Sequence, residues 1–148
     1  MSKKLSAALL ITDGENVLLE LATGRSYGDH NFDLPKGEVD KNEAPIDAAI
    51  RETYEETSLD YRSLKDQIVE YGTLPYSPKK NIYLCVLKVD KMPDLSSLQC
   101  LSFFKGPYNK DYPEVASYEI VSKDLLRDYL YRNWSNTLTD EIMSKIFS

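Results

Sequence analysis

Three glutamates, Glu52, Glu55 and Glu56, stand close together in the segment Arg51-Glu52-Thr53-Tyr54-Glu55-Glu56. In a helix, at about 100° per residue, Glu55 lies about 60° to one side of Glu52 and Glu56 about 40° to the other. Carboxylates on one narrow face repel one another and destabilise an isolated helix. A divalent cation such as Mg²⁺ or Mn²⁺ would neutralise them and would act on phosphates. The spacing therefore suits a metal site, and a solvated acidic face stays an equal alternative.

The same helix is expected to pack its opposite face on a sheet. That face carries Ile46, Ile50, Thr53, Tyr54 and Thr57. Pro45 fits only a first helical turn, which predicts a helix start between Asn42 and Ala44. Arg51 lies one turn before Glu55 and is expected to pair with that carboxylate.

The residues around the acidic face resemble the Nudix hydrolase box, written G-x5-E-x7-R-E-U-x-E-E-x-G-U with U a bulky apolar residue. The positions that match are Gly37, Glu43, Arg51, Glu52, Glu55, Glu56 and Leu59. Two positions depart from the pattern. Thr53 replaces an apolar residue and is expected to cost some packing. Ser58 replaces the second glycine and predicts a less favourable helix exit, because a positive φ costs Ser more than Gly.

The resemblance implies a hydrolase that cleaves nucleoside diphosphates linked to another moiety and uses Mg²⁺ or Mn²⁺. It implies metal binding by Glu52, Glu55, Glu56 and the Gly37 carbonyl, with Glu52 and Glu55 also catalytic. Glu43 and Arg51 would support the loop and the helix. Lys36 precedes Gly37 and would reach a substrate phosphate, the alternative being a solvated lysine. Gly37 itself is expected at a turn after a short strand that begins near Asn31.

Two further stretches bear on the substrate. Lys79-Lys80-Asn81-Ile82-Tyr83-Leu84 is similar to the strand entry of diadenosine tetraphosphate hydrolases within this family. The resemblance implies that Lys79 or Lys80 binds a phosphate and that Tyr83 contacts a base or a phosphate. Pro113-Glu114-Val115 resembles the stretch where those enzymes place a further acid, so Glu114 is a candidate metal ligand or general base. The alternatives are turn lysines, a core tyrosine and a surface acid.

Residues 91 to 113 form a long segment of weak regularity, and loops of that length are more often functional than idle. Its aromatic and basic side chains include Phe103, Phe104, Lys105, Tyr108 and Tyr112. Aromatic rings beside lysines suit a platform for a nucleotide base. The alternative is that the rings pin the loop to the body of the domain.

The remaining pattern predicts one domain over residues 1 to 148. Strands are expected at 5–12, 17–22, 67–74, 81–89 and 116–121, with a hairpin turn at Asp13-Gly14 and a loop at 23–30. Pro75 to Lys80 is expected to separate two of these strands. Ser122 is expected to cap a helix that runs to Tyr131, and a last helix is expected at 138–147. The family resemblance implies an α/β fold, an α/β/α sandwich with a mixed central sheet.

Composition limits the partners. The formal net charge is −6, from 24 acids and 18 bases, which argues against binding long nucleic acids. Cys85 and Cys100 provide no disulfide framework, and Cys85 is expected to be a core thiol in a reducing cytosol. The apolar run from Leu5 to Ile11 is expected to be a strand rather than a signal peptide. We therefore expect a cytoplasmic monomer or homodimer that binds a small nucleotide and no membrane.

The favoured substrate is a dinucleoside polyphosphate such as diadenosine tetraphosphate. Two alternatives stay open within the enzyme class, ADP-ribose or another nucleotide sugar and the 5′ end of an RNA. A third alternative is a regulatory domain that binds a nucleotide without turnover. The complete set of box carboxylates favours an enzyme, because a domain that only binds has no need for a full metal site.

Overall fold

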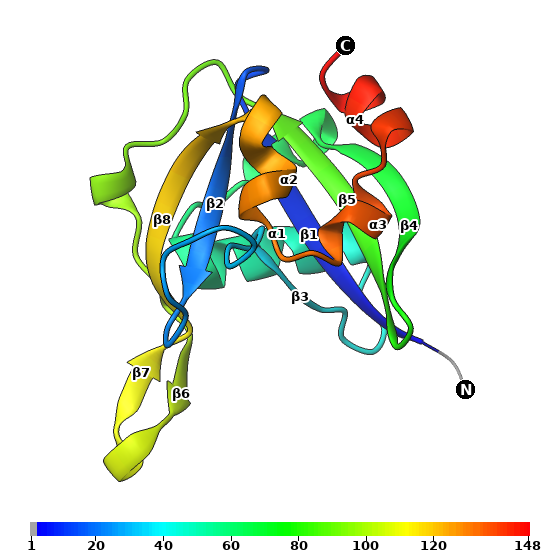
Figure 1. The fold of residues 1–148 in the computed structure, drawn as a ribbon. Coiled ribbons are helices and arrows are strands. Elements are labelled where there is room, and N and C mark those ends of the chain that lie inside the picture. The colour runs from blue at the N-terminus through cyan, green and yellow to red at the C-terminus, as the bar shows by residue number, and fades with distance from the viewer. Residues whose placement is uncertain (1–2) are drawn as a thin grey trace.

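A computed structural model describes residues 3–148, and at its centre lies a six-stranded sheet in which five strands follow the order β4-β5-β1-β2-β8 and β3 pairs with β1 (Figure 1). The strands of the structure are β1 Lys4–Thr12, β2 Asn16–Ala22, β3 Lys36–Glu38, β4 Val69–Ser77, β5 Lys80–Lys88, β6 Phe103–Lys105, β7 Asp111–Pro113 and β8 Val115–Ser122. The α-helices are α1 Pro45–Thr57, α2 Leu126–Tyr129, α3 Trp134–Thr137 and α4 Asp140–Ile146. Short 3-10 helices span Arg62–Gln67, Leu95–Ser97, Pro107–Asn109 and Lys123–Leu125.

The sheet is mixed, because β1 runs parallel to β5 and antiparallel to β2 and β3. The predicted hairpin is confirmed, and Gly14 supplies the positive φ of 101° in its turn. β1 and β2 pair only at Thr12 and Val17 and then diverge. β3 pairs with β1 where β2 has left it, with Ala7 opposite Gly37. The divergence of the first two strands therefore places Gly37 in the sheet.

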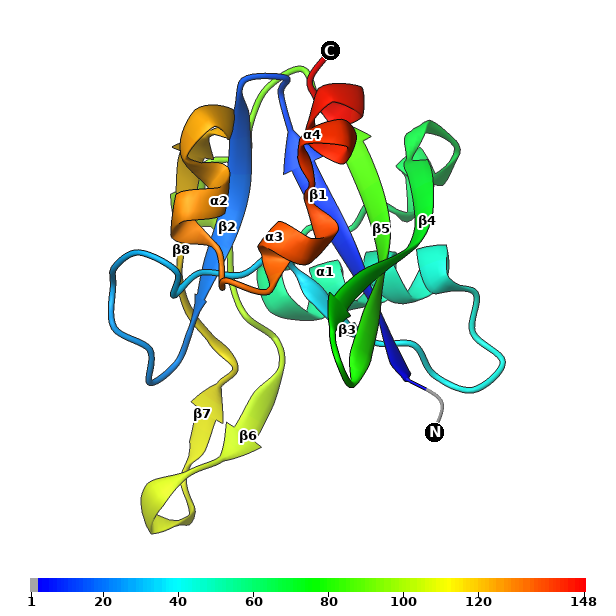
Figure 2. The ribbon, with the colours of Figure 1, turned by 45° about the vertical axis from the view of Figure 1, so that its right-hand side comes forward.

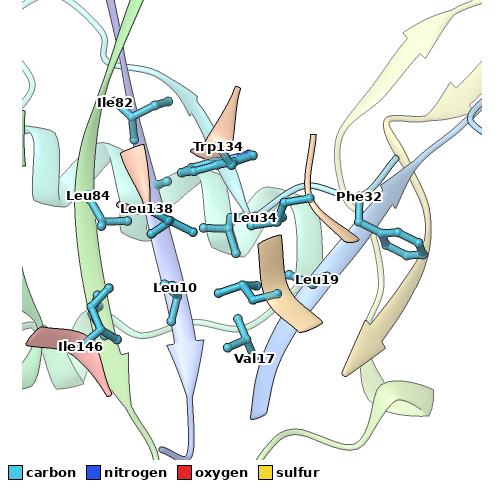
Figure 3. Packing of buried hydrophobic residues seen from close by; sticks show 14 of the residues in the cluster. Leu10, Val17, Leu19, Phe32, Leu34, Ile82, Leu84, Trp134, Leu138 and Ile146 are labelled. Carbon is cyan, nitrogen blue, oxygen red and sulfur yellow. The ribbon is translucent and has the colours of Figure 1, made fainter. Parts of the chain in front are cut away.

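Helices cover both faces of the sheet, which confirms the α/β/α sandwich (Figure 2). Side chains alternate along β1, so that Leu10 packs toward α2, α3 and α4 while Leu9 packs toward α1. On the first face, Trp134 and Leu138 lie over the sheet residues Leu10 and Ile82 (Figure 3). Cys85 is buried in the cluster under α1, as predicted.

α1 begins at Pro45 with Ala44 as its N-cap residue, which confirms the predicted start. The buried positions on its sheet-facing side include Ile46, Ile50, Thr53 and Thr57, as predicted. Tyr54 was expected among them and this is wrong, because its side chain is 45% exposed. Tyr54 is offset by about 100° from Thr53 around the helix axis, which carries it off the buried face.

The two departures from the box are accommodated in different ways. Thr53 is fully buried, and its hydroxyl donates to the Ala49 carbonyl at 2.7 Å, so its polar atom is satisfied. Ser58 ends α1 in the left-handed region with φ 66°, and its N–H donates to the Tyr54 carbonyl. The helix exit therefore has the geometry that glycine favours, although a serine supplies it.

The second half of the chain differs from the prediction in several boundaries. β4 continues through Pro75 to Ser77, and the turn to β5 is only Pro78-Lys79. Ser122 does cap a helical turn, since its hydroxyl accepts from the Asp124 N–H. The predicted helix to Tyr131 is a 3-10 turn followed by the four-residue α2, and α3 was missed. The last helix begins only at Asp140, after the cap residue Thr139.

The segment from 91 to 113 was expected to be a long loop of weak regularity, but its second half contains two short strands. β6 and β7 form an antiparallel hairpin that pairs with no other strand of the described chain. The hairpin extends away from the body of the protein (Figure 2). Three-residue strands are too short to show alternation in the sequence, which is why this element escaped prediction.

Within residues 3–148, no helix is both long enough and apolar enough to cross a membrane.

Candidate active site

Gly37 lies inside β3 rather than at the predicted turn, and its missing side chain has a structural reason. A Cβ built on Gly37 would overlap the carboxylate carbon and both oxygens of Glu52. The Glu52 carboxylate of α1 therefore occupies the space that any other residue at position 37 would fill. This contact joins the first and the central parts of the box.

Arg51 connects four acidic side chains beside α1. Its guanidinium donates to Glu43 at 2.9 Å, to Glu52 at 2.9 Å and to Glu55 at 3.2 Å, and it lies 3.5 Å from Asp40. The predicted pair with Glu55 is confirmed. Glu43 also accepts from the Asp40 N–H at 3.0 Å, so that it holds the loop before α1. The supporting roles of Glu43 and Arg51 stay predictions, for which these contacts supply the geometry.

Glu56 turns away from Arg51 and is buried against the sheet. Its Oε1 accepts from the Lys36 N–H at 3.1 Å, and its own carbonyl accepts from the Tyr118 hydroxyl at 2.5 Å. Glu56 thereby links α1 to β3 and β8. The three box glutamates on α1 thus have different surroundings, because Glu55 is partly exposed while Glu52 and Glu56 face the sheet.

A fourth carboxylate, Glu20 on β2, belongs to this cluster and was missed in the sequence. Glu20 is only 6% exposed and its side chain lies against that of Glu56. Its Oε1 has no hydrogen-bond partner among residues 3–148. Its N–H and carbonyl pair with Asp33. In the run Val17 to Ala22, a single acid reads as a solvent-facing strand position, and nothing local indicates that it is buried.

Burial sets the protonation of these acids. Burial, and then the neighbouring Glu56 carboxylate, raise the pKa of Glu20 well above its ordinary value. Burial raises the pKa of Glu56 to about 8. Burial also raises the pKa of Glu52, and the nearby carboxylates of Glu55 and Glu114 act in the same direction. The cluster therefore favours either protons or a cation over free negative charge.

Lys36 is not the solvated lysine of the alternative interpretation. Its Nζ lies 3.1 Å from Asp33 Oδ2. Burial by itself lowers the pKa of Lys36, but the Asp33 carboxylate, together with Tyr76 and Glu56, raises that pKa above its ordinary value. Asp33 Oδ1 in turn accepts from the Trp134 indole N–H at 2.8 Å. Trp134 therefore positions the Asp33 carboxylate, and that carboxylate in turn positions Lys36 beside the box.

The other candidate residues lie at different distances from the box acids. Lys80 lies close enough to Lys36 for the two charges to interact, and burial followed by that charge lowers the Lys80 pKa. Lys79 is exposed in the adjoining turn. Tyr83 of β5 lies under α1, and its hydroxyl donates to Glu70 of β4 at 2.8 Å. This hydrogen bond therefore links the two strands. Glu114 is exposed at the start of β8, within electrostatic range of Glu52.

The residues present fit a divalent cation in their chemistry. The orphaned Glu20 oxygen, the Glu56 carboxylate and the Gly37 cradle around Glu52 supply hard oxygen donors in a buried setting. Among residues 3–148, no three acidic, histidine or cysteine side chains are gathered tightly enough to hold a metal as they stand. Arg51 and the Lys36 N–H engage these carboxylates instead. The metal roles of Gly37, Glu52, Glu55 and Glu56 therefore stay predictions.

The raised pKa values predict that the metal-free protein loses stability as the pH rises. Glu56 releases its proton near its ordinary 4.5 in the unfolded chain but only near about 8 in the folded protein. Because the unfolded state loses the proton first, the free energy of unfolding falls across this interval. We expect urea denaturation in the presence of a chelator to show this decline.

The substitution Glu20→Gln tests the origin of that decline. An amide keeps the shape and can donate to Glu56, so we expect it to stabilise the metal-free protein at alkaline pH by about 1–3 kcal/mol, the cost of one buried unsatisfied group. The exposed Glu141→Gln is the matched control and should leave the pH profile unchanged. An unaltered profile in Glu20→Gln would show that the decline has another source.

Comparison with known proteins agrees with the fold and with the box. The chain is 46% identical over 48 residues to an RNA pyrophosphohydrolase of Bartonella tribocorum, an alignment that covers 32% of this chain and 27% of that protein. The chain therefore spans only about a quarter of the length of that relative. The structure is similar to the NUDIX domain of Shewanella oneidensis NrtR complexed with ADP ribose, with a TM-score of 0.65 and 14% identity over 100% of this chain and 90% of that one.

A second solved structure is also similar in fold. It is a C. elegans Ap4A hydrolase in a binary complex, with a TM-score of 0.56 and 23% identity over 95% of this chain and 93% of that one. The family profile described as the NUDIX domain matches residues 2–133, which is most of the chain. With the box residues gathered on α1 and β3, and with this match, the chain belongs to the NUDIX family.

Proposed function

We propose that this protein is a metal-dependent pyrophosphohydrolase that cleaves a nucleoside diphosphate linked to another moiety. The observation that carries the proposal is the contact between Gly37 and Glu52, in which a glycine leaves the space that a box carboxylate fills. A purely structural helix has no need of a carboxylate pressed against a neighbouring strand. We also propose a single domain over residues 1 to 148 and Mg²⁺ or Mn²⁺ as the cofactor.

The box residues and Glu114 have different roles in this proposal. Glu52, Glu55, Glu56 and the Gly37 carbonyl would hold the metal, which when bound neutralises phosphate charge and lowers the pKa of water. Arg51 and Glu43 keep the carboxylates in place. Glu114 is the candidate general base, because it is exposed and lies within electrostatic range of Glu52.

Lys36 and Lys80 support the binding of a phosphate chain beside the carboxylates. The two ammonium groups are close enough to interact, so a polyphosphate would relieve their repulsion. Lys79 lies in the adjoining turn and extends the same basic edge. The Tyr83 hydroxyl bonds to Glu70, so a contact between Tyr83 and the substrate stays a prediction. We propose a dinucleoside polyphosphate such as diadenosine tetraphosphate as the substrate, because a longer phosphate chain uses more than one lysine.

A second candidate is the 5′ end of an RNA, favoured by the similarity to an RNA pyrophosphohydrolase over 48 residues. The net charge of −6 works against a long RNA, because each phosphate beyond the site meets an acidic surface. ADP-ribose is a further alternative substrate. A last alternative is that this protein is a regulatory domain that binds a nucleotide without turnover. The fold is shared with a domain that was crystallised with ADP ribose.

A substrate panel tests the proposal. Purified protein with Mg²⁺ or Mn²⁺ is offered diadenosine tetraphosphate, ADP-ribose and a 5′-triphosphorylated RNA, and the products are identified by chromatography. We expect metal-dependent cleavage, fastest for diadenosine tetraphosphate, and none in the presence of a chelator. The absence of turnover with every substrate and both metals would support the binding domain instead. Cleavage of the RNA alone would transfer the assignment to the second candidate.

A further inference from the structure

The chain segments before β6 and after β7 both lie next to the candidate active site. Before β6, the Leu101 N–H donates to the Glu55 carbonyl of α1 at 2.7 Å. After β7, the Glu114 carbonyl accepts from the Thr23 N–H at 3.1 Å. Glu114 also lies within electrostatic range of Glu52. A substrate held at the box acids would therefore meet the base of this hairpin.

Strand alternation identifies the face of the hairpin that leads to the acids. The ladder continues beyond the last paired strand residue, because the Glu114 N–H donates to the Ser102 carbonyl at 2.9 Å. Side chains two residues apart share a face, so Tyr112 lies on the Glu114 face. Phe104 is the cross-strand partner of Tyr112 and shares that face. Phe103 points to the opposite face.

The two rings on the Glu114 face are held in a fixed arrangement. The centroids of Phe104 and Tyr112 are 6.0 Å apart, with ring planes inclined by 31°. The Tyr112 hydroxyl donates to the Pro107 carbonyl at 3.3 Å. A side chain at Gly106 would overlap the Tyr112 ring, so a glycine lets the backbone close over that ring. Yet Phe104 remains 40% exposed, on a hairpin that stands clear of the body (Figure 1).

We propose that Phe104 and Tyr112 form a platform that binds the planar base of the nucleotide substrate, an inference that rests on the proposed function. Tyr112 lies about 7 Å from Glu114 along the strand, one side-chain repeat beyond the acid. Exposed aromatic rings next to a site for phosphates suit a base, because every base offers an apolar face for stacking. The alternative occupant of the same rings is a second copy of this chain.

Two leucine substitutions on the same strand test the platform. Phe104→Leu keeps an apolar side chain against Tyr112 but removes the ring, and Phe103→Leu is the matched control on the opposite face. Calorimetry with Mg²⁺ measures the binding of ADP, which carries a base, and of inorganic pyrophosphate, which does not. We expect Phe104→Leu to weaken ADP binding by roughly 5- to 150-fold, the worth of one stacked base. Pyrophosphate binding should not change, and Phe103→Leu should change neither.

Circular dichroism and thermal melting verify that both variants are folded. Equal ADP affinity in the two variants would overturn the platform. A fall in solution mass for Phe104→Leu, measured by light scattering, would also overturn it, because the rings would then join two copies. Since ADP binding needs no turnover, the platform and the proposed hydrolysis fail on different measurements.

Discussion

Glu56→Gln is expected to lower kcat by about 10²- to 10³-fold, because a metal contributes several kcal/mol of charge stabilisation and about 1.4 kcal/mol is tenfold in rate. The same substitution should not lower the melting temperature. The Gln amide oxygen can still accept from the Lys36 N–H, and the change removes an acid whose charged form is disfavoured by burial. Loss of rate with unchanged or higher stability separates a metal ligand from a structural residue.

Steady-state kinetics on the best substrate of the panel, with thermal melting of the same samples, check this result. Glu141→Gln removes an exposed carboxylate on α4 and is the matched control, with activity expected to be unchanged. Glu55→Gln should also lose most of the rate, although its side chain is more exposed than that of Glu56. Retention of activity by both Glu55→Gln and Glu56→Gln would rule out the proposed hydrolysis at this site.

Gly37→Ala is expected to lower kcat by about 10²-fold while the protein stays folded. The added methyl group would overlap the Glu52 carboxylate, which is the far end of a flexible side chain and can swing away. The fold therefore survives, but the carboxylate is displaced from its position. A misplacement of about 1 Å in an active site can lower the reaction rate by about 10²-fold.

The control for this substitution is Gly14→Ala, at a turn with φ 101° and open space around the Cβ. Backbone strain should cost this variant about 1 kcal/mol of stability without loss of rate. Kinetics and urea denaturation of both variants separate the two effects. Full activity in Gly37→Ala would show that Glu52 does not act from the position seen against β3.

Much of α1 could be predicted because its signals are local. Pro45 marks its first turn, and the buried side follows from helical spacing. The pair between Arg51 and Glu55 also follows, since side chains four residues apart are neighbours on a helix. Tyr54 was placed wrongly because it lies at the margin of the buried face, where spacing alone does not decide exposure.

The hairpin and the C-terminal helices could not be predicted with the same accuracy. β6 and β7 have three residues each, and their pairing depends on a turn at Pro107–Asn109 rather than on a repeated pattern. The short α2 and α3 are stabilised by packing on the sheet, with Trp134 and Leu126 fully buried. Helices of four residues are too short to form by propensity alone, so tertiary contacts determine where they lie.

The sequence by itself determined the family box, the acidic face of α1, the hairpin of β1 and β2 and the α/β class. These features depend on neighbours within a few residues or on fixed spacing. Only the tertiary structure decided that Glu20 joins Glu56, that Arg51 holds Glu43 as well as Glu55, and that the hairpin rises beside Glu52. The physical reason is that these contacts join segments distant in the chain, and strand order and divergence, which no local pattern encodes, bring them together.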